Sequence, residues 1–138
     1  MEFMNDINLL AVFVAAISFF ALGAVWYSKM LFANHWIRYT KIDISDPNST
    51  KGVGKIMLFS FIWMLISSFG IAVIRSRLEI AGPESGIKLG LLTGLFFGVS
   101  AISISYLYEK RPLGLYFING GYTLLGNIIA GLIICIWD

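Results

Sequence analysis

The stretch LGLLTGLFFGVSAISISYLY, residues 89–108, contains no charged side chain over 20 consecutive positions. An α-helix needs about 20 mostly apolar residues to cross a hydrocarbon core about 30 Å thick. Three further charge-free runs lie at residues 7–28, 56–74 and 112–137, and they are 22, 19 and 26 residues long. A soluble domain offers no good explanation for four such runs. The sequence therefore predicts an all-α fold, an integral membrane bundle of four transmembrane helices.

We expect one four-span membrane domain over residues 1–138, with spans at about 7–27, 56–74, 89–108 and 115–137. A transmembrane barrel would need strands of about 10 residues with alternating polarity, and the sequence has no such pattern. The last run is longer than one straight crossing requires. It starts at Pro112 and is interrupted by Gly120-Gly121. Tilt, a bend at these glycines or an interfacial first turn would each absorb the excess.

The composition agrees with a membrane protein. Hydrophobic residues make up 58% and charged residues 13% of the chain, whereas soluble domains have about 45–50% and about 25%. A net charge of +2 is too small for a nucleic-acid-binding surface, so we expect no nucleic-acid partner. The single cysteine, Cys135, excludes an intramolecular disulfide, and we interpret it as a small buried residue. The first residues include Glu2 and Asp6 and lack the positive charge of a signal peptide, so we interpret the first run as a retained span.

Basic residues are divided unequally between the two sides of such a bundle. The long loop at 28–55 and the turn at 109–111 carry seven Lys and Arg, and the loop at 75–88 carries three. The positive-inside rule then predicts that the long loop faces the cytoplasm and that both termini lie outside it. From Met30 to Tyr39 the loop alternates apolar, aromatic and basic residues, which is typical of a short interfacial helix.

Two sets of residues at four-residue spacing mark candidate functional faces. Close packing of helices in lipid depends on small residues that let backbones approach. The third span has a glycine-zipper pattern that predicts such a helix-packing face, either within the chain or between copies, at Gly86, Gly90, Gly94 and Gly98. The fourth span has a candidate polar intramembrane face at Asn119, Thr123 and Asn127. These amides could hydrogen-bond neighbouring helices, or they could line a polar passage.

No Asp, Glu, Lys, Arg or His lies inside a predicted span. Proton-coupled transporters and pumps usually place such a residue within the membrane, and small multidrug exporters of similar length carry a carboxylate in their first span. Catalysis needs convergent nucleophiles, bases or metal ligands, and this chain offers only scattered hydroxyls and amides. We therefore assign no catalytic residue, no metal ligand and no cofactor, and we expect the protein not to be an enzyme.

Several segments together resemble a known family. They begin with Asn8 to Val12, continue through Leu22-Gly23-Ala24-Val25-Trp26-Tyr27-Ser28 and Leu31-Phe32 to Trp36, and end with Glu109 to Pro112, Asn119 to Tyr122, Gly131 and Trp137. This pattern is similar to bacterial four-span membrane proteins of the family catalogued as domain of unknown function 1761. The most specific part is an interfacial motif at Gly23, Trp26, Tyr27 and Trp36. The resemblance implies a protein of the bacterial inner (cytoplasmic) membrane, and it brings no activity or ligand with it.

Two functions remain open at this stage. The first is a small polytopic membrane protein without an assignable biochemical activity, acting as an oligomeric structural or accessory component. Its partners would be the lipid bilayer and either further copies, as a homo-oligomer, or another membrane protein. The alternative is a small channel-like or transport protein with a polar passage lined by the fourth span.

Overall fold

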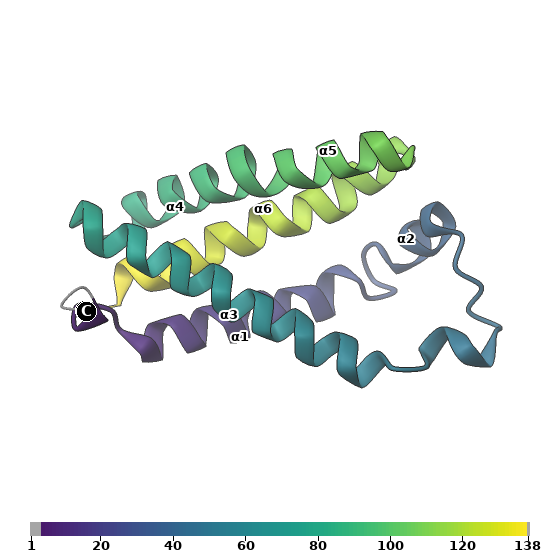
Figure 1. Cartoon of the computed structure of the whole chain (residues 1–138), viewed down its shortest axis with the longest axis horizontal. Helices are drawn as coiled ribbons and strands as arrows, with labels where there is room; N and C mark the ends of the chain where they lie inside the picture. Colours follow the sequence, from purple (N-terminus) through teal and green to yellow (C-terminus); the bar gives the residue numbers. More distant parts are fainter. Residues whose placement is uncertain (1–3, 138) are drawn as a thin grey trace.

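The computed structural model describes residues 4–137, and these residues form an all-helical bundle without a strand (Figure 1). Four long segments are apolar and long enough to cross a membrane. They contain α1 (Leu9–Trp26), α3 (Val53–Leu78), the continuous series α4 (Pro83–Leu91), η3 (Leu92–Val99) and α5 (Ser100–Glu109), and finally α6 (Leu113–Ile136). The first loop holds α2 (Ala33–Thr40) and the 3₁₀ turn η2 (Pro47–Thr50). The predicted all-α architecture with four long helical segments is confirmed.

Local capping explains where the helices begin and end. The side chain of Asn8 accepts a hydrogen bond of 3.1 Å from the backbone N–H of Ala11 and thereby caps α1. Pro112 precedes α6, at a position where a missing N–H costs little. Helices α3 and α5 are capped by the residues that follow them, Glu79 and Lys110, which adopt left-handed backbone conformations with φ of 52° and 56°. The helix bounds therefore differ from the charge-free runs, and α3 extends beyond 56–74 at both ends.

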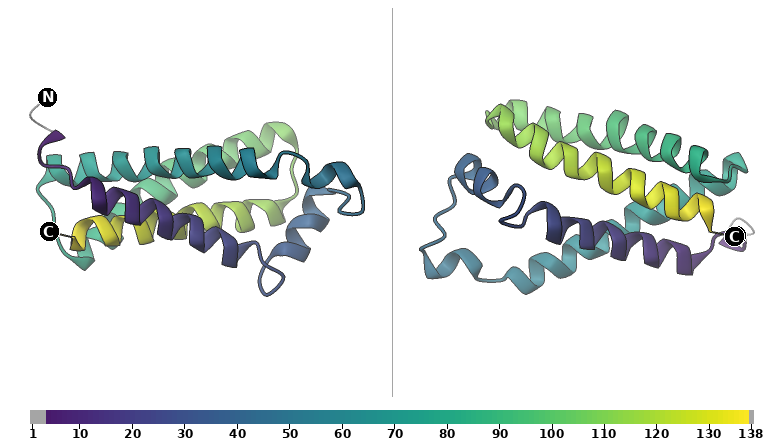
Figure 2. Two further views of the ribbon diagram at one scale, coloured as in Figure 1. Left: turned by 90° about the horizontal axis from the view of Figure 1, so that it is seen from below. Right: turned by 180° about the vertical axis from the view of Figure 1, so that it is seen from behind.

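The fourth span is one uninterrupted helix, because α6 continues through Gly120 and Gly121 from Leu113 to Ile136. Both described ends of the chain lie at one end of the bundle, and the loop with α2 and η2 lies at the other (Figure 2). The seven basic residues of the loop and the turn therefore share the loop end. Which end faces the cytoplasm remains a prediction from the sequence.

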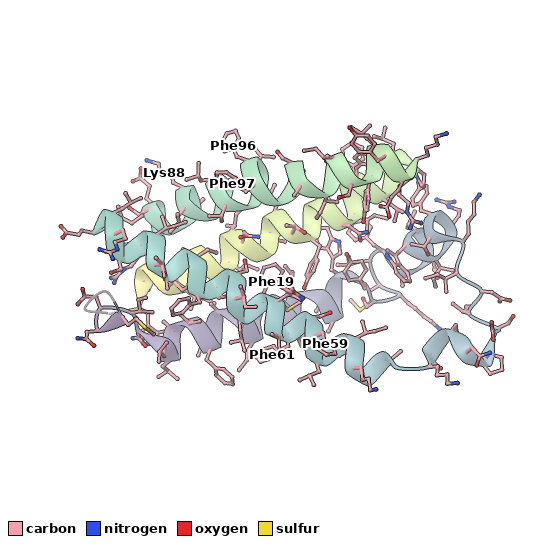
Figure 3. All side chains as sticks on the ribbon, in the orientation of Figure 1. Phe19, Phe59, Phe61, Lys88, Phe96 and Phe97 are labelled. Atoms are coloured by element: carbon pink, nitrogen blue, oxygen red, sulfur yellow. The ribbon has the colours of Figure 1, made fainter. Side chains whose placement is uncertain are left out.

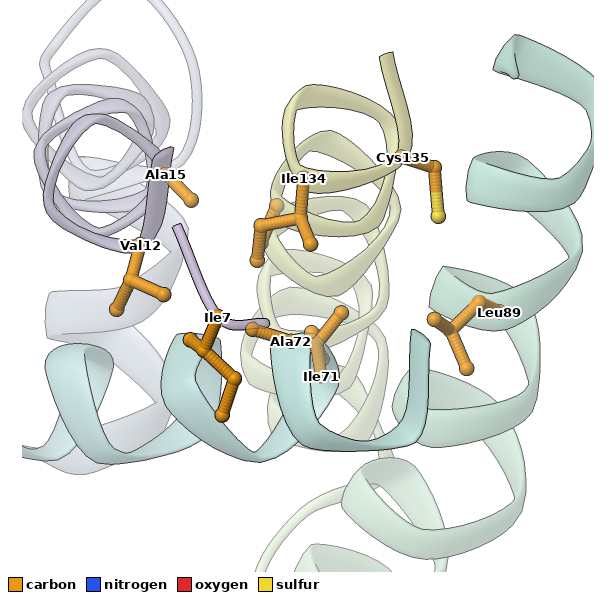
Figure 4. Packing of buried hydrophobic residues seen from close by; sticks show 9 residues of the cluster. Ile7, Val12, Ala15, Ile71, Ala72, Leu89, Ile134 and Cys135 are labelled. Atoms are coloured by element: carbon orange, nitrogen blue, oxygen red, sulfur yellow. The ribbon is translucent and has the colours of Figure 1, made fainter. Parts of the chain in front are cut away.

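The hydrophobic core lies towards the end of the bundle that holds the termini (Figure 4). All the long segments contribute to it, with Ile7, Val12, Ala15, Ile71, Ala72, Leu89, Ala130, Ile134 and Cys135. The backbone N–H of Gly82 also donates a 2.8 Å hydrogen bond to the carbonyl of Cys135 at this end. The buried residues of α3 are Ser68, Ile71 and Ala72, all in its second half. The bundle is thus closed at the terminal end, and the first half of α3 is peripheral.

The third span contains eight residues of π-helix, η3, a wide form with i→i+5 hydrogen bonds. In an α-helix, residues four apart are offset by about 40° around the axis, because one turn holds 3.6 residues. Glycines at strict four-residue spacing would therefore wind around an α-helix. A π-helical turn holds more residues and reverses this drift. Because η3 begins after Gly90, the glycines on both sides of the transition face α6.

All four predicted packing glycines lie against α6 of the same chain. A carbon placed at the Cβ position of Gly86 would lie 2.7 Å from the carbonyl oxygen of Gly131. The corresponding carbon at Gly94 would lie 3.0 Å from Leu124 Cα, and that at Gly98 would lie 2.7 Å from the Thr123 methyl group. At Gly90 it would overlap the backbone of Ile128. No side chain fits between these two backbones, which is why the segment carries glycine here.

Candidate binding cleft

A cleft of about 700 Å³ opens at the loop end of the bundle, between α1, α2, α3, α5 and α6. No charged side chain lines it. Its aliphatic wall comes mainly from Ile37, Ile42, Ile44, Val53 and Ile56, and its aromatic, hydroxyl and amide groups come from Tyr27, Trp36, Ser60, Tyr106, Asn119, Tyr122 and Thr123. Small-molecule sites typically have volumes of about 300–1,000 Å³ and combine apolar walls with a few polar groups. Both the size and the lining of this cleft match that description.

The cleft exists because α2 is held on one side and α3 diverges on the other. Helix α2 contacts the start of α6, where the ring of Tyr39 packs directly on Gly114. The ring of Trp36 on α2 meets Tyr27 edge-on, with 6.2 Å between the ring centroids. No residue in the first half of α3 is buried, and Figure 1 shows this half running away from α5 and α6. The space between these elements is the cleft.

A chain of hydrogen bonds crosses the floor of the cleft. The hydroxyl of Tyr27 donates to Asn119 Oδ1 at 2.5 Å, and Asn119 Nδ2 donates to the hydroxyl oxygen of Tyr106 at 2.5 Å. These bonds connect the end of α1 to α6 and α5. Among residues 4–137, no acceptor takes the hydrogen of the Tyr106 hydroxyl itself. The chain therefore ends in a free donor that borders the cleft.

Two other aromatic side chains fix α1 to α6 beside this floor. The indole N–H of Trp26 donates to the carbonyl of Ile118 at 2.9 Å, and the hydroxyl of Tyr122 donates to the carbonyl of Phe19 at 3.1 Å. A Cβ at Gly23 would lie 2.9 Å from the Tyr122 hydroxyl. The predicted interfacial motif thus lies around the cleft: Tyr27 and Trp36 line it, Trp26 holds its α1 wall, and Gly23 leaves room for Tyr122.

A second cavity of about 420 Å³ continues along α6 towards the core. Thr123 lines both cavities. The rest of the second cavity is mainly apolar, with Phe19, Gly70, Ile71, Ile74 and Phe97, together with Ser67, Thr93, Gly98 and Asn127. Asn127 is buried, accepts a 3.1 Å hydrogen bond from Thr93 and donates a 2.8 Å bond to the carbonyl of Thr123.

The residues of the predicted polar face on α6 therefore line both cavities. Asn119 lies at the upper cleft, Asn127 at the lower cavity, and Thr123 joins the two. Both amides have partners within the chain, as a structural role in holding helices together requires. Whether they also serve a ligand or a passage remains a prediction.

The chemistry available in the two cavities is hydrogen bonding and apolar contact. Their polar groups are hydroxyls, amides and one indole. Among the described residues, no group of three or more His, Cys, Asp and Glu is close enough to hold a metal ion. The charged side chain of Arg111 lines an adjoining cavity with Thr40 and Trp36 and lies 3.9 Å from Glu109. In the loop, the side chain and backbone of Ser45 donate to Asp43 and lower the pKa of its carboxyl group.

The sequence assigned no role to Ser60 or Tyr106, and it marked Tyr122 only as part of a segment that resembles the family. Tyr106 gave no specific signal, because aromatic residues are common at the ends of membrane spans. Tyr122 carried a clearer signal, because a tyrosine well inside a span needs a partner for its hydroxyl. Ser60 gave no usable signal, since a helical serine can bond to its own backbone.

The fold and the cleft define a class: small all-helical proteins with four helices suited to crossing a membrane. A family model described as "Protein of unknown function (DUF1761)" matches residues 10–135. The chain therefore belongs to this family, and the resemblance seen in the sequence is confirmed over nearly its whole length. No curated protein and no solved structure matches the chain.

Proposed function

We propose that this chain is a binding protein of the bacterial inner membrane, an accessory component that takes a small uncharged amphipathic molecule into the cleft. The observation that carries the proposal is the cleft itself, about 700 Å³ in volume and lined from five helices without a charged side chain. A structural protein that only packs its helices has no need for such a space. The expectation that the protein is not an enzyme is kept in this proposal.

The lining favours an uncharged ligand. A charged group would lose its hydration on entering the cleft and would find no opposite charge there, which is costly. The free donor of Tyr106 matches an acceptor oxygen, such as that of a carbonyl, ester or ether. The rings of Tyr27 and Trp36 and the isoleucines of the loop and α3 match the apolar part of the molecule. An amphipathic ligand satisfies both sides of this surface.

The alternative of a passage across the membrane has less support within one chain. The two cavities extend along α6 only as far as Asn127, Ile71 and Ile74. Beyond them lies the packed core, where Ala15, Ala130 and Cys135 have exposed fractions of 0–1%. The amides of Asn119 and Asn127 are also less available to an ion, because both are already hydrogen-bonded within the chain.

Association of copies belongs to the proposal as well. The outer face of α3 presents large apolar side chains, including Phe59 and Trp63, which are 59% and 68% exposed. Phe96 projects from the opposite edge of the bundle (Figure 3). Such faces suit lipid or a second copy. The seven-to-three distribution of basic residues supports a cytoplasmic loop end, so the cleft would open near the inner leaflet.

Native mass spectrometry of the protein in lipid nanodiscs tests the binding proposal, with 1-decanoylglycerol as an uncharged amphipathic probe. We expect a saturable adduct of one probe per chain. Ser60→Phe fills the cleft and should reduce the adduct about tenfold, because overpacking costs about 1–3 kcal/mol. Ser105→Phe, the same change at an exposed site on α5, is the matched control. An adduct that is equal in both variants would show that the probe binds elsewhere and would refute the proposal.

A further inference from the structure

The upper cleft and the lower cavity are neighbours along α6 and share one lining residue. Thr123 lines both, and the stretch of α6 that borders them runs from Asn119 to Asn127. Eight residues of α-helix advance about 12 Å. A molecule that occupied both cavities would therefore extend about 12 Å along α6.

The polarity of the lining changes from the upper cleft to the lower cavity. At the upper end, the hydrogen-bond chain through Tyr27 and Asn119 leaves a free donor at Tyr106. At the lower end, the hydroxyl of Thr93 and the amide of Asn127 bond to each other and to the backbone. The remaining lower wall is mainly hydrocarbon, apart from the hydroxyl of Ser67. A polar group thus fits the upper end, and an alkyl chain fits the lower end.

The lower cavity also has room to receive a chain from the side. Gly70 on α3 lines it, and a Cβ placed there would meet no atom within 4 Å. Phe97, on the opposite wall, is 69% exposed. The wall between α3 and the π-helix is therefore open towards the surface that the bilayer would cover, and a lipid-like molecule can slide its chain in from the membrane.

We propose that the two cavities together bind one single-chain lipid-like molecule with an uncharged, acceptor-bearing head. The head accepts a hydrogen bond from Tyr106 beside Asn119. The chain passes Thr123 and ends between Gly70 and Phe97, about 12 Å further along α6. This inference rests on the proposed function and adds the class of ligand, its direction in the cleft and the position of its tail.

Photo-crosslinking locates the tail directly. The probe is 1-decanoylglycerol with a diazirine at the end of its acyl chain, added to the full chain in nanodiscs and mapped by mass spectrometry after irradiation. We expect crosslinks at the half-buried walls of the lower cavity, chiefly Ile74 and Ser67, and we expect excess unlabelled 1-decanoylglycerol to suppress them. Labelling spread evenly over outward residues such as Phe59 and Trp63 would mean that the chain lies in bulk lipid, and it would overturn the inference.

Two glycines of α3 provide a matched pair of variants. Gly70→Leu adds a side chain at a residue that lines the lower cavity and should reduce crosslinking there about tenfold, because the leucine and the probe's chain would overpack the same space. Gly54→Leu is the control, because a Cβ at Gly54 also meets no atom within 4 Å and this residue lines neither cavity. Equal crosslinking of Ile74 and Ser67 in both variants would refute the assigned tail position.

The mass-spectrometric adduct distinguishes failure of the proposed binding function from failure of the lipid-like binding geometry. If the adduct forms and depends on Ser60, but crosslinks avoid the lower cavity, the binding function stands and the lipid-like geometry is wrong. If the adduct is also absent, both proposals fail. Tyr106→Phe tests the head group. It should weaken the adduct while the remaining crosslinks stay at Ile74 and Ser67, and a full-strength adduct would exclude the hydrogen bond to the head.

Discussion

The close contact between α4 and α6 predicts that one added methyl group, at Gly90, lowers the stability of the protein. In Gly90→Ala, the new Cβ would overlap Ile128 Cα and lie 2.6 Å from the carbonyl oxygen of Asn127. Carbon atoms in favourable contact are about 3.5–4.0 Å apart. The obstacles are backbone atoms and cannot rotate away, so the two helices must separate locally by about 1 Å.

Gly120→Ala on α6 is the matched control for this change. A Cβ there would lie 3.5 Å from Val99 Cγ1, an ordinary contact. Both substitutions gain about 1 kcal/mol from the better helix propensity of alanine, and only Gly90→Ala also suffers overpacking of about 1–3 kcal/mol. The difference between the two variants therefore isolates the packing cost, and we expect Gly90→Ala to be the less stable by about 1–3 kcal/mol.

Equilibrium unfolding of both variants in the same detergent, followed by helical circular dichroism, measures this difference. Gly120→Ala should match or exceed the stability of the parent protein. If Gly90→Ala is equally stable, then α4 and α6 are not in backbone contact at this position, and the explanation of the glycine spacing is wrong.

Three further predictions follow from the polar face, the charge distribution and the outer surface. Replacing Asn119 and Asn127 together by leucine should lower the free energy of unfolding by about 1 kcal/mol, because each interhelical hydrogen bond is worth about 0.6 kcal/mol on average; an unchanged value would deny these amides a role in stability. A reporter that is active only in the cytoplasm should stay silent when fused after Asp138, and strong activity would reverse the predicted orientation. Native mass spectrometry from nanodiscs should detect assemblies of more than one chain, and a purely monomeric spectrum at every protein concentration would remove association from the proposed function.

The sequence predicted the number of spans because charged residues are costly in the bilayer core. It could not predict the helix ends equally well. Helix α3 includes Lys55 near its start and Arg75 and Arg77 in its last turn, since a helix continues until its backbone is capped and not until its first charge. The π-helix left no sequence signal either. It lies in a run of apolar residues and glycines, and the register required by the contact with α6 favours it over an α-helix.

The cleft was beyond prediction for a different reason. Its position depends on the divergence of α3 and on the docking of α2 against Gly114, and both are long-range contacts. The sequence did mark Asn119, Thr123 and Asn127 as one face, because their spacing places them on one side of a helix. It could not indicate that Tyr27 and Tyr106, 79 positions apart, would bond to the same amide.

The sizes of the residues along α6 explain why one end of the bundle is closely packed and the other end has a cleft. Its second half has small residues at Gly126, Ala130 and Gly131, against which Phe19 and the backbone of α4 pack closely. Its first half instead presents Asn119 and Tyr122, whose longer side chains hydrogen-bond to Tyr27, Tyr106 and Phe19 in other parts of the bundle. Small residues let the backbones meet and exclude any ligand, whereas polar side chains hold the helices through their tips and leave space between them. The same helix therefore packs the core at one end and borders the cleft at the other, so the proposed ligand would lie apart from the packing that stabilises the fold.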